Sequence, residues 1–210
     1  MGIKEIINWL GEFSKLTAEK NLPESVKVII CPSNPHITLL KETETEMGYV
    51  TGAQDFSLEE KGAHTGETGA YQIKELCGFS IVGHSERKED HDTVVRKRDL
   101  ALKNKITPIV CFVNPNDAPK FYAKGAFLCW EDPSNISKNG EYREKNPAEI
   151  KKGIEEIRKE IPKDAVLIYG GSVNRENIKG LSKIDGIDGV LVGNASLEAG
   201  HFVDIINSSI

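Results

Sequence analysis

Residues that could move a proton follow two of the short apolar runs in this chain. His84 comes directly after an apolar run and a glycine, and Glu86 lies two positions further on. A histidine at the end of a buried strand, with a carboxylate within reach, can donate or accept a proton. A second carboxylate, Glu131, follows an apolar run that ends at Trp130, where poor solvation would suit it to act as a general base.

Each of these residues also has a plainer interpretation. A lone histidine is more often a surface residue without a role, and four histidines have this interpretation: His36, His64, His91 and His201. His84 differs from them because of its neighbours. Glu131 fits a solvated loop carboxylate equally well. The long polar segment 131–146 nevertheless resembles a lid that would exclude water from a base.

Two glycine-containing turns could bind a phosphate. Gly170-Gly171-Ser172 and Gly193-Asn194 each lie between an apolar run and a helical pattern. Glycine lets the backbone approach a phosphate closely, and a helix N-terminus offers free N–H groups with a favourable dipole. Two such turns in successive units favour a phosphate site more than one turn would. The alternative is that both are ordinary tight turns.

The elements that must position these residues alternate along the chain. Seven short apolar runs are typical of buried strands, at residues 26–31, 49–53, 79–82, 107–112, 126–130, 165–169 and 187–192. Helical patterns precede, separate and follow them, and residues 3–16 and 147–161 give clear examples. This alternation predicts an α/β fold with a parallel sheet covered on both faces. A doubly wound sheet and a (β/α) barrel both fit, and the polar residues at strand ends favour the barrel.

Composition fits one globular domain over residues 1–210. Charged residues make up 28% of the chain and hydrophobic residues 39%. The net charge of -5 is mixed in sign with no basic tract, so nothing indicates nucleic acid binding. No apolar run approaches the roughly 20 residues of a membrane helix, and the start lacks signal-peptide features. Four scattered cysteines predict buried thiols and a cytoplasmic protein: Cys31, Cys77, Cys111 and Cys129.

Four segments together resemble the triosephosphate isomerase family and occur in the family's order. They are Gly62-Ala63-His64-Thr65-Gly66-Glu67, Ile81-Val82-Gly83-His84-Ser85-Glu86-Arg87, Tyr169-Gly170-Gly171-Ser172-Val173 and Asp188-Gly189-Val190-Leu191-Val192-Gly193-Asn194-Ala195-Ser196-Leu197. The resemblance covers nearly the whole chain from about Val26. It implies a TIM (β/α) barrel that interconverts dihydroxyacetone phosphate and glyceraldehyde 3-phosphate without a cofactor or metal. It further implies a dimeric enzyme of glycolysis and gluconeogenesis.

The resemblance also implies roles for single residues. His84 matches the neutral histidine that polarises the substrate carbonyl, Glu131 matches the base, and Glu86 matches a carboxylate beside the site. Thr65 matches the loop tip that reaches into the neighbouring subunit of the family's dimer. The matched phosphate-binding positions are Ser137, Gly171, Ser172, Gly193 and Asn194.

The chain departs from the family at several of these places. Asp132 stands where proline follows the base, Ser137 and Asn139 stand where the lid has glycines, and Asn194 replaces a second glycine. The family also begins with a strand carrying an Asn-x-Lys motif, whose lysine contacts the substrate. This sequence begins at what matches the first helix. These departures predict impaired activity in this form, with a catalytically inactive binding or scaffold protein as the alternative.

A missing first strand would leave a barrel of seven recognisable strands with an opening. The runs 26–31 and 187–192 would then be unpaired edges inside a core, which is costly. Three outcomes stay open: the barrel closes in another way, a partner fills the opening, or the gene product is longer. In the last case Met1 would match the methionine that follows the family's lysine, and the upstream coding sequence would test this.

Overall fold

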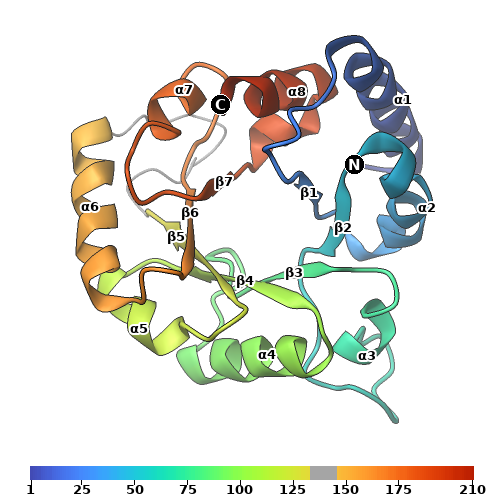
Figure 1. The fold of residues 1–210 in the computed structure, drawn as a ribbon. Coiled ribbons are helices and arrows are strands. Elements are labelled where there is room, and N and C mark those ends of the chain that lie inside the picture. The colour runs from blue at the N-terminus through green and yellow to red at the C-terminus, as the bar shows by residue number, and fades with distance from the viewer. Residues whose placement is uncertain (133–145) are drawn as a thin grey trace.

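Seven parallel strands form one curled sheet in the computed structural model, which describes residues 1–132 and 146–210. Figure 1 shows them around a common axis, and each strand pairs with the next in sequence. The strands are β1 (Ile29–Ile30), β2 (Val50–Ala53), β3 (Phe79–Val82), β4 (Thr107–Phe112), β5 (Phe127–Glu131), β6 (Val166–Gly170) and β7 (Gly189–Leu191). A doubly wound sheet reverses its strand order, and this sheet does not. The predicted (β/α) barrel with seven strands is therefore confirmed.

Helices surround the strands on the outside of the barrel (Figure 1). In the described residues they are α1 (Ile3–Lys20), α2 (Ile37–Met47), α3 (Ala70–Ile73), α4 (His91–Lys103), α5 (Ala118–Phe121), α6 (Pro147–Glu160), α7 (Ile178–Leu181) and α8 (Ala199–Ser208). Short 3₁₀ helices cover Asn34–His36, Pro115–Asp117 and Asn194–Leu197. No helix of the described part of the chain is both long enough and apolar enough to cross a membrane.

Local polar groups set where several helices begin. The Asp90 carboxylate accepts from Thr93 N at 2.8 Å and starts α4, and Asn146 caps α6 directly before Pro147. Asn174 caps the turn that leads into α7, because its side chain accepts from the N–H groups of Glu176 and Asn177 and its carbonyl accepts from Ile178 N at 3.1 Å. The extended backbone of Glu198 separates the 3₁₀ turn Asn194–Leu197 from α8.

Apolar side chains form a large layer between strands and helices and a smaller cluster inside the barrel. The inner cluster contains Phe79, Ile81, Ile109, Cys111, Cys129 and Ile168. All four cysteines are free thiols, and three of them are buried as predicted, whereas Cys31 is half-buried. Burial raises the pKa of the Cys77 thiol to about 11 and that of Cys31 to about 12.

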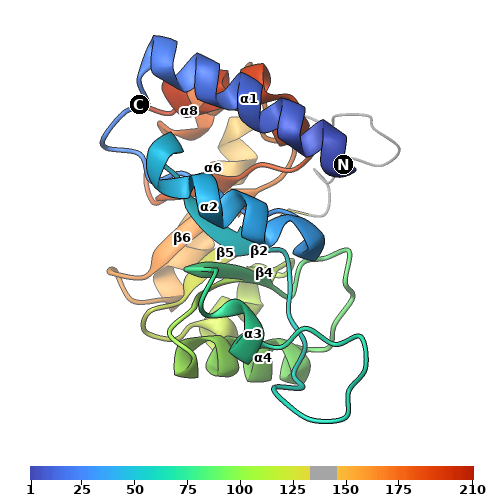
Figure 2. The same cartoon turned by 90° about the vertical axis from the view of Figure 1, so that its right-hand side faces the viewer.

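The two ends of the sheet, β1 and β7, are separated by an opening that we call the seam. Among the described residues no strand lies between them, as the sequence predicted. β1 is also shorter than the predicted run 26–31. Helices α1 and α8 pack side by side near the seam (Figure 2), and Trp9 of α1 donates its indole N–H to Ser196 O at 3.0 Å.

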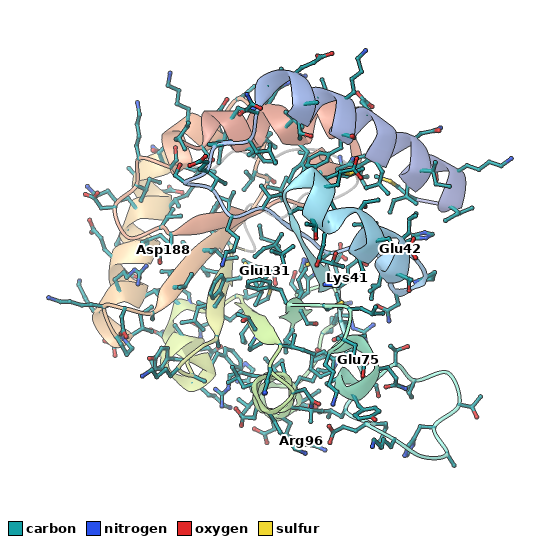
Figure 3. The ribbon with its side chains drawn as sticks, turned by 45° about the vertical axis from the view of Figure 1, so that its right-hand side comes forward. Lys41, Glu42, Glu75, Arg96, Glu131 and Asp188 are labelled. Carbon is teal, nitrogen blue, oxygen red and sulfur yellow. The ribbon has the colours of Figure 1, made fainter. Side chains whose placement is uncertain are left out.

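The N-terminal ends of β6 and β7 are held by one arginine. Arg158 of α6 donates to the Asp188 carboxylate at 2.5 Å, and the same carboxylate accepts from Leu167 N at 2.8 Å. Figure 3 shows Asp188 beside these strands. Arg158 also donates to the Gly186 carbonyl at 2.9 Å. These bonds fix the strands whose opposite ends carry the two candidate phosphate turns.

Candidate active site

His84 is positioned by a glycine that no other residue could replace without strain. β3 ends at Val82, and Gly83 has a positive φ of 73° that turns the chain. A Cβ on Gly83 would lie 2.8 Å from Val94 Cγ2 and 3.1 Å from the Cys111 carbonyl oxygen. The turn leaves the His84 side chain 30% exposed at the C-terminal end of the barrel.

Glu131 is the last residue of β5 and points into the barrel interior (Figure 3). Its side chain is 5% exposed, so the sequence expectation of a poorly solvated carboxylate is confirmed. One carboxylate oxygen, Oε2, accepts from Ser85 N at 2.8 Å. The other, Oε1, accepts from Ser85 Oγ at 3.0 Å and lies 3.1 Å from His84 Nε2. The two candidate catalytic groups are therefore in direct contact.

The residue before Glu131 is anchored on both sides. Trp130 donates its indole N–H to the Val113 carbonyl at 3.1 Å. Its ring lies against Gly153 of α6, where a Cβ would come within 2.2 Å of Trp130 Cη2. The Trp130 indole thus links β5, the end of β4 and α6 directly beneath the candidate base.

Glu86 lies beside the site and not within it. Its side chain is 84% exposed, and its Oε2 is 3.9 Å from His84 Nδ1, beyond hydrogen-bond distance. Instead the Glu86 backbone N–H approaches Nδ1 at 3.4 Å. A ring nitrogen that accepts carries no proton, so a neutral His84 would hold its proton on Nε2, facing Glu131. The sequence interpretation paired His84 with Glu86, whereas the carboxylate that contacts the ring is Glu131.

Both candidate phosphate turns line the same cavity of about 2140 Å³ as His84 and Glu131. Gly171 is buried, and Ser172 is one of the few non-glycine residues with positive φ, at 44°. The Ser172 carbonyl accepts from the Asn177 side chain at 2.9 Å. Gly193 and Asn194 are exposed, and nothing lies within 4 Å of a Cβ on Gly193. The lining of the cavity is therefore polar and open at the C-terminal ends of β6 and β7.

The lysine and arginine side chains that line the described part of this cavity are already engaged or remote. Arg87 contacts Asp55 at 2.8 Å, and the buried Lys97 contacts Asp55 at 2.6 Å and Glu89 at 2.5 Å. Lys27 precedes β1, so it lies at the opposite end of the parallel barrel from Glu131. The sequence interpretation missed Ser85 and this ion-pair network. Lys97 did carry a signal, because it occupies the apolar face of a helix.

Five other positions named in the sequence interpretation have different outcomes. Thr65 is exposed in the segment between β2 and α3, which projects from the barrel in Figures 1 and 2. Ser137 and Asn139 lie outside the described residues, whereas Asp132 is described and buried. The plain surface interpretation of His36 is wrong, because its side chain is buried and its Nδ1 has no partner.

Comparison with known proteins gives the chain a family. The family model described as triosephosphate isomerase matches residues 2–126 and 120–209, which together span almost the whole chain. The chain belongs to the triosephosphate isomerase family. This agrees with the resemblance that the four sequence segments indicated and with the barrel architecture.

Curated relatives named triosephosphate isomerase are similar over most of their length. The Wolbachia pipientis wMel protein is 32% identical, over 86% of this chain and 79% of the relative. The Thermus thermophilus protein is 30% identical, over 94% of this chain and 90% of the relative. A Dehalococcoides mccartyi protein is 33% identical, over 87% of this chain and 83% of the relative. The family of this chain is thus a family of isomerases.

Proposed function

We propose that this chain interconverts dihydroxyacetone phosphate and glyceraldehyde 3-phosphate by proton transfer through an enediolate. The observation that carries the proposal is the 3.1 Å contact between Glu131 Oε1 and His84 Nε2. A buried carboxylate and an imidazole N–H at one strand-end site are the base and the electrophile that such a transfer needs. Family membership and the two turns on the same cavity support the same reaction.

In the proposed mechanism Glu131 removes a proton from the carbon next to the substrate carbonyl. The electron pair of the broken C–H bond forms the enediolate, and the His84 Nε2–H donates to its oxygen. The Nε2 proton of His84 passes to the enediolate oxygen, and Nε2 takes up the proton of the neighbouring hydroxyl, so the negative charge moves to that second oxygen. The protonated Glu131 then returns its proton to the carbon that carried the carbonyl, the second oxygen becomes the aldehyde oxygen, and no atom is gained or lost. Because Glu131 already contacts Nε2, the substrate oxygen must replace that contact before the reaction begins.

Ser85 is proposed to hold the base while the site is empty. Its N–H and hydroxyl groups donate to both oxygens of Glu131, which offsets the cost of burying the charge. The substrate therefore competes with Ser85 and His84 for one carboxylate. Glu86 is proposed to set the His84 tautomer through its backbone N–H, and its own carboxylate takes no proton.

The substrate phosphate is proposed to bind at Gly171, Ser172, Gly193 and Asn194. These residues line the cavity at the C-terminal ends of β6 and β7, where backbone N–H groups can face an anion. Ser137 is added on the family resemblance alone. We propose that activity is impaired in this form, because Arg87 and Lys97 are ion-paired within the described residues and their charges are offset.

The same observation supports a second candidate, a catalytically inactive member that binds a phosphate compound or serves as a scaffold. A coupled assay in both directions, paired with calorimetric titration of glycerol 3-phosphate, separates the two. Turnover that falls about 10²- to 10⁴-fold in Glu131→Gln supports the isomerase. Binding of glycerol 3-phosphate without turnover above the buffer rate supports the inactive member.

We further propose the domain, the pathway, the compartment and the assembly in which this activity takes place. The whole chain, residues 1–210, acts as one barrel domain that takes part in glycolysis and gluconeogenesis in the cytoplasm. Four free thiols suit a reducing compartment. The exposed segment around Thr65 is proposed to contact a second copy in a homodimer.

A further inference from the structure

The seam has two free strand edges that face one cavity. Among the described residues β1 pairs only with β2, and β7 pairs only with β6. Every residue of β3 is buried, whereas every residue of β1 and β7 is only half-buried. Residues of both edges line the cavity of about 2140 Å³. The sheet therefore has a free edge on each side of this cavity.

The backbone of β1 directs polar groups into this space. Val50 N donates to the Val28 carbonyl at 2.9 Å, so the groups of Val28 and Ile30 face β2. Successive residues of a strand direct their N–H and C=O groups to opposite edges. Those of Ile29 and Cys31 therefore face the seam. Half-buried backbone groups without a protein partner are costly, and they form a template for another strand.

The side chains around the seam are apolar on both faces. Ile29 and Leu191 pack with the cluster inside the barrel, whereas Ile30 and Val192 pack with the cluster between α1, α2 and α8. Four residues of these helices also line the cavity: Ile6, Trp9, Leu40 and Phe202. A strand placed here would be buried on both faces, as strands of parallel sheets are, and its sequence would be a continuous apolar run.

We propose that the seam binds an extended apolar segment of polypeptide, which pairs in parallel with β1 and β7. An apolar small molecule would leave the backbone groups of Ile29 and Cys31 unsatisfied. A strand satisfies them on both edges and fills the space between the inner and outer side chains. Within the described residues, every strand of a second copy is already held in that copy's own sheet, so none could enter between β1 and β7 without leaving it. The occupant is an extended segment of about five residues, the usual strand length.

Hydrogen exchange on the full chain tests this directly. The probe is a synthetic peptide of alternating valine and isoleucine, about five residues long, with lysines at both ends for solubility. Its control has the same side chains but carries N-methyl groups on alternate central amides, which removes backbone donors. We expect the probe to slow exchange at the Ile29 and Cys31 amides about tenfold or more. The Val50 amide, already bonded to β1, stays unchanged, and the control peptide has no effect.

A pair of variants tests the same edge from the protein side. Ile29→Pro removes the N–H donor that faces the seam and leaves the hydrogen bonds to β2 intact. Strands tolerate proline at such an edge position. Ile29→Val keeps the donor and is the matched control. We expect Ile29→Pro to abolish saturable probe binding and Ile29→Val to retain it, with circular dichroism unchanged in both. If Ile29→Pro fails to fold, the comparison of the two peptides on the native chain decides.

Three results would overturn the proposal. The first is unchanged exchange at Ile29 and Cys31 at saturating probe. The second is equal binding of the N-methylated peptide, which would mean that the cavity takes apolar groups without strand pairing. The third is protection of these amides that rises with protein concentration in the absence of peptide, which would make a second copy the occupant. None of these measurements depends on turnover, so they are independent of the proposed isomerase activity.

Discussion

Glu131 is a buried carboxylate that must stay charged to act as a base. These two requirements usually conflict, because burial disfavours the charged form. Its side chain is 5% exposed, and its oxygens meet the two Ser85 donors and His84 Nε2. Charge-assisted bonds of this kind offset the desolvation of the ion. At the scale of single residues, the site thus depends on contacts between positions 46 apart in sequence.

That separation explains what the sequence could and could not predict about the site. His84 and Glu131 were recognisable because each follows an apolar run, which is a local pattern. The role of Ser85 was not recognisable, since its partner lies on another strand and no periodicity connects them. Glu86 was expected to contact His84 because it is near in sequence, but the turn after Gly83 directs its side chain into solvent.

A first prediction concerns the buried thiol of Cys77. Burial raises its pKa from 9.0 to about 11, so between these values the unfolded thiol ionises while the folded one stays protonated. Its contribution to stability is fully present below pH 9 and is lost as the pH rises towards 11. Urea denaturation at pH 8 and pH 10 should show a steeper loss of unfolding free energy in the native chain than in Cys77→Ala. Equal slopes in the two proteins would contradict this.

At the scale of elements, apolar runs located the strands but not their lengths. β3 and β4 match their predicted ranges, and β2, β5 and β6, which are also paired on both edges, begin and end within one residue of theirs. β1 keeps only two residues of the predicted run 26–31, since one of its edges faces the seam. The regular helix α7 begins only at Ile178, after a turn whose N–H groups are capped by the Asn174 side chain. The seam itself was predictable only by counting strands against the family pattern.

A second prediction tests how α6 supports the candidate base. Gly153→Ala would place a Cβ within 2.2 Å of the Trp130 ring, so the indole beneath Glu131 must move. Overpacking of this kind should reduce the unfolding free energy by about 1–3 kcal/mol and shift tryptophan fluorescence. Gly11→Ala is the matched control, because this glycine of α1 has nothing within 4 Å of its Cβ position. It should stabilise the chain by about 0.5–1 kcal/mol. A neutral Gly153→Ala would show that Trp130 is not fixed by α6.

At the scale of the whole molecule, the segment between β2 and α3 projects from the barrel, and residues 61–67 at its tip, Thr65 among them, are exposed. We predict concentration-dependent dimers in sedimentation velocity, and weaker association for Thr65→Asp, because a charge at the contact would have to be desolvated. Ser182→Ala, at an exposed serine, is the control. A monomer at the highest soluble concentration would contradict the proposed dimer.

The barrel brings the two candidate catalytic groups together even though its sheet is not closed. Seven strands suffice to bring His84 and Glu131 within 3.1 Å of each other. They leave the seam open beside the same cavity that the candidate phosphate turns line. A weak activity is therefore expected, and a sensitive measurement of proton transfer is needed to detect it.

Proton exchange between substrate and solvent is the most direct test of the central claim. Dihydroxyacetone phosphate is incubated with the protein in D₂O, and deuterium incorporation at the carbon beside the carbonyl is followed by proton NMR. We predict incorporation by the native chain and by Glu86→Gln, and a loss of about 10²- to 10⁴-fold in Glu131→Gln. Equal incorporation by the native chain and Glu131→Gln, or none above the buffer rate in the native chain, would contradict the account.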